Sequence, residues 1–208
     1  TPGNASLFRL PLDDPPPSKG LIWIASNCAP ARVEFVRELM KYIKVDAPGK
    51  CLNNMKWPKD LPTRHGSEKI PLLAQYKFTL SLENALTEDY VSEKFYQPLL
   101  AGSVPVYLGA PNVDEFAPSA KSFVDLRNYR TIQELASALR RLMKDDLAYS
   151  EYHAWRRTPL SSRFRRHMQL AFNTGGIYGE RDMRQNPCRL CDAAAAAVDA
   201  QVAKSAKC

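Results

Sequence analysis

The chain has 208 residues, of which 45% are hydrophobic, 10% aromatic and 25% charged. This length fits one ordinary domain or one lobe of a larger enzyme, and the composition is that of a globular protein, which excludes a repeat array and global disorder. No stretch approaches the roughly 20 consecutive apolar residues of a membrane-spanning helix, and the N-terminus lacks the regions of a signal peptide. We therefore expect this chain neither to span a bilayer nor to carry its own export signal.

The net charge of +7 is concentrated in one part of the chain. Residues 1–150 hold 19 basic and 17 acidic side chains, whereas residues 151–190 hold 8 basic and 3 acidic ones. The basic stretch interleaves arginines with aromatic residues and histidines, a pattern also used to bind nucleic-acid phosphates. A solvated helical face explains the same pattern, and we prefer that interpretation. The arginines concerned are Arg156, Arg157, Arg163, Arg165 and Arg166.

In the first part of the chain, a proline-rich stretch over residues 1–19 predicts a linker ahead of a folded domain that begins at Gly20. The apolar run 21–25 predicts a strand buried on both faces. From Pro30 to Ile43, apolar residues recur with helical spacing. This part of the chain is therefore expected to form a strand, a loop and a helix.

Further along the chain, residues 78–82, 104–108 and 122–126 favour strands. A helix over 92–101, closed by Gly102, is expected between the first two of these strands, and an amphipathic helix from Thr131 to Lys144 after the third. The chain from Leu147 onward is expected to be helical and basic, and residues 193–208 to form a low-complexity tail. Strands alternating with helices predict an α/β fold with a mostly parallel sheet.

Ligands of such sheets bind at the carboxyl ends of the strands, so we inspected the loops that follow the predicted strands. Ser92 can cap the helix that follows it, leaving Glu93 and Lys94 in the first turn. A lysine there opposes the helix dipole by roughly 0.3–1 kcal/mol unless an anion lies nearby. Free backbone N–H groups beside an ammonium are what a nucleotide diphosphate requires, although an ordinary surface Glu-Lys pair gives the same sequence.

Arg32, in the loop after the first strand, is a second candidate for phosphate binding, or else an ordinary exposed helix arginine. The sequence has no glycine-rich phosphate loop of the Walker or GxGxxG type and no Asp-x-Asp triplet to hold a divalent metal. Phosphate binding would therefore rest on side-chain cations.

The five cysteines indicate disulfides rather than a metal site. Cys188 and Cys191 form a single CxxC, and no second ligand pair with suitable spacing completes the four ligands of zinc. A redox motif would open a helix after a strand, whereas this pair follows Asn186-Pro187 near the chain end. Structural disulfides of an oxidising compartment are the simpler interpretation, and a glycosylation acceptor at Asn4 agrees with it.

Several segments together resemble the donor-binding region of the α-1,3-fucosyltransferases, glycosyltransferase family ten. They are YKFTLSLEN at 76–84, DYVSEK at 89–94 and PLLAGSVPVYLGAPNVDEFAPSAKSFVDL at 98–126. Shorter matches lie at SNCAPAR (26–32), YHAWR (152–156) and CRLCD (188–192), so the resemblance covers roughly residues 20–192. The GAPNVDEFAP and CRLC segments look most like plant and algal enzymes that fucosylate the Asn-linked core N-acetylglucosamine.

The resemblance implies a Rossmann-like, GDP-fucose-binding lobe over 20–192, the C-terminal half of a two-lobed GT-B enzyme. It implies transfer of L-fucose from GDP-β-L-fucose, with inversion, to N-acetylglucosamine of a glycoprotein N-glycan. Arg32 and Lys94 would neutralise the diphosphate, so that no divalent metal is required for donor binding. Glu93 would bind sugar hydroxyls. Tyr90 would line the pocket, and Glu83 and Asn84 would shape its floor.

Inversion needs a general base, and in this family the base comes from the N-terminal lobe, so we expect no catalytic residue in this chain and no turnover by it alone. The resemblance also implies a type II membrane protein of the Golgi lumen whose anchor lies outside this chain. Cys51, Cys188 and Cys191 are disulfide candidates. Cys51 or the terminal cysteines can pair with partners in the missing lobe, and Cys188 can alternatively pair with Cys191, although this makes a small, strained ring. The alternatives are a non-catalytic GDP-sugar-binding relative and a basic nucleic-acid-binding module, although we expect no nucleic-acid partner.

Overall fold

The computed structural model describes residues 16–61 and 69–173, and within these ranges five parallel strands form one sheet in the order β2-β1-β3-β4-β5. The prediction of an α/β fold with a parallel sheet is confirmed. The strands are β1 Lys19–Ile22, β2 Val45–Asp46, β3 Tyr76–Leu82, β4 Val104–Leu108 and β5 Val124–Asp125.

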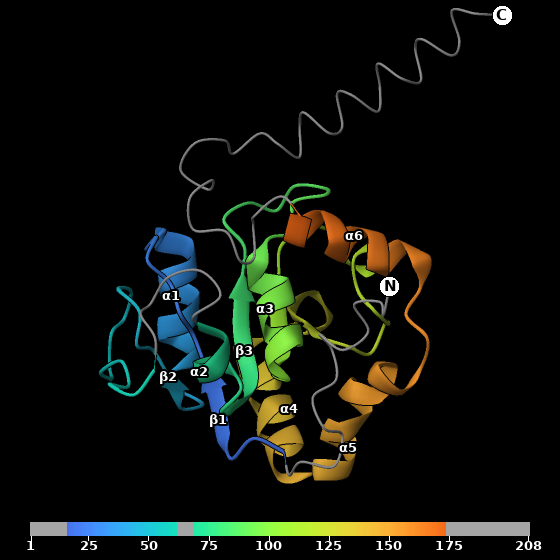
Figure 1. Ribbon diagram of the computed structural model, residues 1–208. Coiled ribbons are helices and arrows are strands. Elements are labelled where there is room, and N and C mark those ends of the chain that lie inside the picture. The colour runs from blue at the N-terminus through green and yellow to red at the C-terminus, as the bar shows by residue number, and fades with distance from the viewer. Residues whose placement is uncertain (1–15, 62–68, 174–208) are drawn as a thin grey trace, which may run out of the picture.

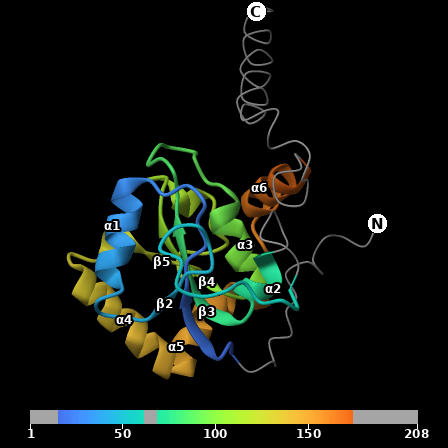
Figure 2. The same ribbon diagram turned by 90° about the vertical axis from the view of Figure 1, so that its left-hand side faces the viewer.

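Helices cover both faces of this sheet (Figures 1 and 2). α1 contacts α4 on one face, and α2 contacts α3 on the other. The α-helices are α1 Pro30–Leu39, α2 Ile70–Leu73, α3 Glu93–Ala101, α4 Ile132–Lys144, α5 Asp146–Ser150 and α6 Ser162–Asn173, and the 3₁₀ helices are η3 Val113–Glu115, η4 Leu126–Asn128 and η5 Glu151–Arg157. In the part of the chain that the structure describes, no helix is both long and apolar enough to cross a bilayer.

The strand order creates a switch point between β1 and β3. The chain leaves β1 for β2 on one side, then crosses back and adds β3, β4 and β5 on the other side. The loops that follow β1 and β3 therefore depart toward opposite faces, and sheets of this doubly wound order bind ligands in the crevice between two such loops. Helices α1 and α3, which continue these loops, indeed lie on opposite sides of β3 (Figure 1).

β3 lies at the centre of the sheet and all seven of its residues are buried. Because helices cover both faces of the sheet, the face of β3 that carries polar side chains is buried as well as the apolar one. The polar side chains on the second face find partners, because the hydroxyls of Thr79 and Ser103 lie 2.8 Å apart and Ser81 donates to the carbonyl of Thr79 at 3.3 Å. Satisfied in this way, hydroxyl groups can be buried without a large desolvation cost.

The predicted helices over 92–101 and Thr131–Lys144 and the strand over 104–108 are confirmed to within one residue. The first helix ends at Leu39 rather than Ile43, because the next residues form turns although Ile43 stays buried. The first strand starts at Lys19, inside the predicted linker, and ends at Ile22 rather than at residue 25. The strand expected over 122–126 shortens to Val124–Asp125, because the side chain of Asp125 caps a 3₁₀ turn.

Both ends of α3 are fixed by capping residues. Ser92 accepts a hydrogen bond from the backbone N–H of Lys94, and Gly102 adopts φ 79°, a left-handed conformation that suits glycine. Arg156 lies beside the last turn, where its guanidinium donates to the carbonyl of Leu99 and lies 4.6 Å from the ring centre of Trp155. A cation at a helix C-terminus complements the helix dipole.

The arginines of the basic stretch fall into two groups, those that bind other parts of the fold and those that are exposed. Arg156 is used in packing against α3, and Arg163 pairs with Glu115. Arg157, Arg165 and Arg166 are exposed, as a solvated helical face would have them. The helical prediction from Leu147 is confirmed for residues 147–157 and 162–173, whereas residues 158–161 between them are not helical. The predicted tail over 193–208 lies outside the described residues.

His153 makes the stability of this region dependent on pH. Burial, with a further contribution from the charge of Arg156, lowers the pKa of His153 to about 4, and its Nδ1 accepts from Arg156 Nε at 3.3 Å. A depressed histidine pKa means that the unfolded chain binds the proton first. The free energy of unfolding should therefore fall as the pH drops from 6.5 toward 4, by up to about 3 kcal/mol.

We predict that His153→Asn, whose amide oxygen can replace Nδ1 as acceptor, removes this part of the pH dependence. Urea unfolding of both proteins at pH 7, 6, 5 and 4.5 measures it. Parallel curves for the two proteins would show that His153 is not the group responsible.

Candidate functional site

The candidate site lies at the carboxyl end of the central strand β3, at the switch point of the sheet. β3 ends at Leu82, and Glu83 follows with its backbone N–H bonded to the carbonyl of Leu108 at 2.8 Å. The side chain of Glu83 is 0% exposed. A buried carboxylate needs several compensating partners, and those of Glu83 organise the site.

Ser92 supplies most of these partners. Its backbone N–H donates to Glu83 Oε1 at 2.8 Å, and its hydroxyl oxygen lies 2.9 Å from Oε1 and 2.7 Å from Oε2. Because Ser92 is also the N-cap of α3, Glu83 joins the start of this helix to the end of β3. Gly109 leaves room for the contact, since a Cβ at this position would lie 2.6 Å from Glu83 Cγ and 2.2 Å from the hydroxyl of Tyr107.

Lys94 lies between two carboxylates. Its Nζ is 3.4 Å from Glu83 Oε2 and 3.3 Å from Glu93 Oε1, and it donates to the hydroxyl of Ser92 at 3.0 Å. The side chains of Lys94 and Glu93 are 26% and 18% exposed, so both reach solvent. Burial works to lower the pKa of Lys94, but the charges of Glu93 and Glu83 outweigh it and raise this pKa above its usual value. Lys94 is therefore charged at neutral pH.

The two carboxyl groups respond to this environment in opposite ways. Burial raises the pKa of Glu83, and the charge of Lys94 and the bonds from Ser92 offset this only in part. Burial also works to raise the pKa of Glu93, but the charges of Lys94 and Lys69 together with hydrogen bonds hold it below its usual value. Glu93 is thus an ionised group at the solvent-facing side of the cluster, where it can accept hydrogen bonds from a ligand.

Lys69 is a cation that the sequence pattern did not reveal. It precedes α2, whose first residue Ile70 packs against the apolar cluster that contains Phe95 of α3. Burial lowers the pKa of Lys69, which is coupled electrostatically to Glu93 and Lys94. No helical or strand pattern surrounds Lys69 in the sequence. Its proximity to Glu93 and Lys94 of α3 is therefore seen only in the structure.

Arg32 reaches the same strand end from the opposite face of the sheet. It lies in the first turn of α1 and donates from Nη1 to the carbonyl of Leu82 at 3.1 Å and from Nη2 to the carbonyl of Asn27 at 2.7 Å. Its Nε is buried and has no hydrogen-bond partner within the described residues. An arginine presents five donors, so this guanidinium retains donors for a ligand after both carbonyls are satisfied.

Arg32 and Lys94 therefore contact consecutive residues, because Arg32 bonds to Leu82 and Lys94 pairs with Glu83. Both cations were expected at one edge of the sheet, and they reach it from helices on opposite faces (Figure 2). Two cations and the positive end of the α3 helix dipole give this edge the character of an anion-binding site.

The loop between β3 and α3 carries the remaining predicted residues. Asn84 and Tyr90 are both exposed, Tyr90 with 39% of its surface, and the carbonyl of Tyr90 accepts a hydrogen bond from Tyr107 at 3.5 Å. Asp89 has φ 63° and exchanges two hydrogen bonds with Asn112, of 3.0 and 2.9 Å. These bonds fix the loop to the segment after β4. Tyr90 and Asn84 are thus both accessible to a ligand from solvent.

The structure pairs Cys51 with Cys28 in a disulfide. The expectation of a partner for Cys51 outside this chain is therefore wrong: connectivity cannot be deduced from the sequence, and folding brings the two loops together. Cys188, Cys191 and Asn4 lie outside the described residues. Within those residues, no cluster of three or more potential metal ligands occurs.

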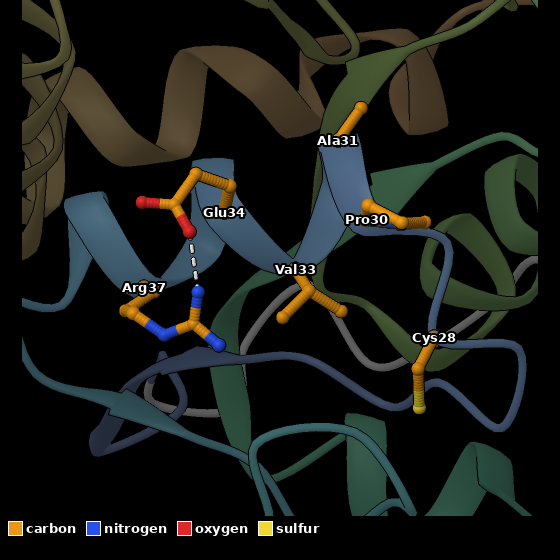
Figure 3. Close-up of a pocket in the computed structure, with 6 residues that line it drawn as sticks. All are labelled: Cys28, Pro30, Ala31, Val33, Glu34 and Arg37. Atoms are coloured by element: carbon orange, nitrogen blue, oxygen red, sulfur yellow. Dashed lines mark hydrogen bonds and ion pairs between the residues drawn. The ribbon is translucent and has the colours of Figure 1, made fainter.

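An open pocket lies beside α1, lined by Cys28, Pro30, Ala31, Val33, Glu34 and Arg37 (Figure 3). Its charged residues Glu34 and Arg37 pair with each other across one turn of the helix. Neither Arg32 nor Lys94 lines it. We therefore distinguish the candidate site at the end of β3 from this pocket.

Most of this chain matches a family of known proteins. Residues 15–207 match the family described as Glycosyltransferase family 10 (fucosyltransferase) C-term. The human GDP-fucose protein O-fucosyltransferase 3 is 42% identical over 141 residues, which cover 65% of this chain and 29% of that protein. The Alpha-(1,4)-fucosyltransferase of Arabidopsis thaliana is 35% identical over 183 residues, which cover 82% of this chain and 43% of that protein.

Solved structures of an alpha1,3-fucosyltransferase are similar in fold. The structure with GDP-fucose matches with a TM-score of 0.58 at 23% identity, over 86% of this chain and 52% of that one. The structure with GDP matches with the same TM-score at 25% identity and the same coverage. The chain thus spans between about three tenths and half of the length of these relatives.

The ion pairs of Lys94 with Glu83 and Glu93 predict how loss of Lys94 alters the stability of the protein. In Lys94→Met the buried Glu83 loses its cation, so its pKa rises further above that of the unfolded chain. A carboxyl with a raised folded pKa costs stability as the pH rises through that pKa. Lys94→Met should therefore lower the free energy of unfolding by about 3 kcal/mol at pH 8 and by less at pH 5.

Urea unfolding at the two pH values measures this effect. Glu83→Gln in the Lys94→Met background should restore most of the loss at pH 8, because no buried charge remains. Lys44→Met, which removes a lysine whose side chain is 87% exposed, is the control and should change stability by less than about 0.5 kcal/mol. A pH-independent loss in Lys94→Met would contradict the assignment of Glu83.

Proposed function

The chain belongs to glycosyltransferase family 10, the fucosyltransferases, and from this premise we propose that it is the donor-binding part of an inverting fucosyltransferase that uses GDP-β-L-fucose. The observation that carries the proposal is the convergence of Arg32 and Lys94 on the end of β3. Membership of the family supports GDP-fucose as the donor. The two cations support the end of β3 as the place where the diphosphate of this donor binds.

The diphosphate of the donor carries negative charge that the site can match. Arg32 offers donors in a fixed plane, which suits two phosphate oxygens at once, and Lys94 adds a compact charge beside the N–H groups of α3. When the bond to fucose breaks, negative charge grows on the departing GDP. Cations held in place before the reaction stabilise this charge without reorganisation, which is how this edge of the sheet contributes to the rate.

The carboxylates give the site hydrogen-bond acceptors in addition to its positive charge. Glu93 is ionised and partly exposed, so it is suited to accept hydrogen bonds from hydroxyls of ribose or fucose. Tyr90 is exposed in the loop between β3 and α3, which leads to the same site. Glu83 takes part indirectly: its buried carboxylate holds Ser92 and Lys94 in place.

For the acceptor we propose N-acetylglucosamine of a glycoprotein N-glycan, fucosylated in α-1,3 linkage. Support comes from the resemblance of the GAPNVDEFAP segment to the plant and algal enzymes and from the similarity to an alpha1,3-fucosyltransferase. Relatives whose names give protein O- and α-1,4-fucosylation share the same region, so this region is expected to serve the common donor. The general base is expected in the additional length that the relatives have.

For the cellular location we propose the Golgi lumen, with a membrane anchor outside this chain. The Cys28–Cys51 disulfide supports this, because disulfides persist in the oxidising compartments of the secretory pathway.

The proposal predicts that GDP and GDP-fucose bind the chain and that both cations contribute. Arg32→Ala and Lys94→Ala should each raise the Kd by at least about tenfold, the weight of one charge-assisted phosphate contact. Isothermal titration calorimetry measures this, with Arg37→Ala as the control because Arg37 is an exposed arginine on the same helix. Unchanged affinity in both variants would exclude the proposed site, and absence of GDP binding by the unaltered chain would exclude the function.

Donor binding should also be independent of divalent metal, because Arg32 and Lys94 take the place that a metal has on other diphosphates. The Kd for GDP should change by less than about twofold between 5 mM EDTA and 5 mM Mg²⁺ at constant ionic strength. Loss of binding in EDTA, restored by Mg²⁺, would contradict this part of the proposal.

A further inference from the structure

The orientation of Arg32 depends on a loop without regular secondary structure. One of its two hydrogen bonds ends on Leu82, in the central strand, and the other ends on the carbonyl of Asn27, in the exposed loop between β1 and α1. A guanidinium presents its donors in a plane, so two fixed acceptors are needed to set the direction of the remaining N–H groups. The position of the Asn27 carbonyl therefore decides where Arg32 points.

The same loop is tethered on both sides of Asn27 to one neighbouring segment. Before Asn27, the carbonyl of Ala25 accepts hydrogen bonds from the backbone N–H groups of Lys50 and Cys51, at 2.9 and 3.1 Å. After Asn27, Cys28 is joined to Cys51 by the disulfide. Both tethers thus end at residues 50–51, although these residues are more than twenty positions away in the sequence.

The segment around residues 50–51, where both tethers end, is itself held in place by hydrogen bonds and close packing. The side chain of Asn54 accepts from the backbone N–H of Ala47 and donates to the carbonyl of Val45, both at 2.8 Å, which ties the segment to the edge strand β2. Gly49 packs directly on the loop, since a Cβ at this position would lie 2.7 Å from the backbone N and O of Ala25. Cys51 is buried, while Cys28 is exposed beside the pocket at α1 (Figure 3).

We propose that the Cys28–Cys51 disulfide is a positioning element for Arg32: it fixes the Asn27 carbonyl and so aims the guanidinium at the donor diphosphate. This inference rests on the proposed function, because it concerns the same anion. Without the disulfide, the loop keeps its tether at Ala25 and loses the one at Cys28, directly after Asn27. Arg32 then keeps only its bond to Leu82 and samples several directions, so that part of its contribution to phosphate binding is lost.

A double-mutant cycle tests the proposal on the whole 208-residue chain. The four proteins are the unaltered chain, Arg32→Ala, Cys28→Ser with Cys51→Ser, and the triple variant, and calorimetry gives the Kd of each for GDP and for uncharged guanosine. We expect the double serine variant to bind GDP about tenfold more weakly and guanosine about equally well. In the Arg32→Ala background, the serine substitutions should change the Kd for GDP by less than about twofold.

Other outcomes would overturn the inference. An equal loss of GDP affinity with and without Arg32 would mean that the disulfide acts by general destabilisation, and an equal loss for guanosine would place its effect elsewhere in the site. Gly49→Ala provides a second test if the serine variant does not fold, because it disturbs the loop at Ala25 while the disulfide stays intact. It should also weaken GDP binding only when Arg32 is present, and an effect that persists in its absence would contradict the proposal.

The test separates this inference from the proposed function. If the unaltered chain does not bind GDP, both fail. If the unaltered chain binds GDP and Arg32→Ala weakens the binding, while the serine variant binds as tightly as the unaltered chain, only the positioning role of the disulfide is wrong.

Discussion

The buried carboxylate of Glu83 accepts hydrogen bonds from Ser92 and pairs with Lys94, and the remaining features of the site are built around these contacts. Ser92 is the N-cap of α3. Because Glu83 holds Ser92, a carboxylate at the end of β3 determines where the helix starts. A charge buried in this way needs a cation for its own stability. Lys94 therefore balances the charge of Glu83 and also presents a positive charge at the edge of the sheet.

The switch point of the sheet explains why a second cation reaches the same place. β1 and β3 are neighbours, but the helices that follow them cover opposite faces. Arg32 comes from α1 and Lys94 from α3, and each bonds to one of two consecutive residues at the end of β3. An anion at the end of β3 would thus be approached from both sides, which a single loop or helix cannot do.

The parts of this site that could be predicted from the sequence are those with a local signal. Ser92 followed by an apolar periodic stretch predicts the helix start, and a lysine in the first turn indicates an anion because it opposes the helix dipole. The place of Arg32 after the first predicted strand made it a candidate for phosphate binding, and the family resemblance then assigned it to the diphosphate. The two-residue strand β2 and the four-residue helix α2 are too short to show a period, and they were missed for that reason.

Contacts between distant segments could not be predicted in the same way. The Cys28–Cys51 pairing and the approach of Lys69 to Glu93 depend on how loops pack, and nothing in the spacing of these residues encodes it. The burial of Glu83 is a similar case, because a glutamate after a strand is usually exposed and only the fold shows that Ser92 and Gly109 enclose it.

A crystal structure of the chain with GDP would test the central claim most directly. The account predicts that the diphosphate lies between α1 and α3, with its oxygens at about 3 Å from both the guanidinium of Arg32 and the ammonium of Lys94. A nucleotide whose phosphates contact neither side chain, or that occupies the pocket beside Cys28 and Arg37, would contradict it.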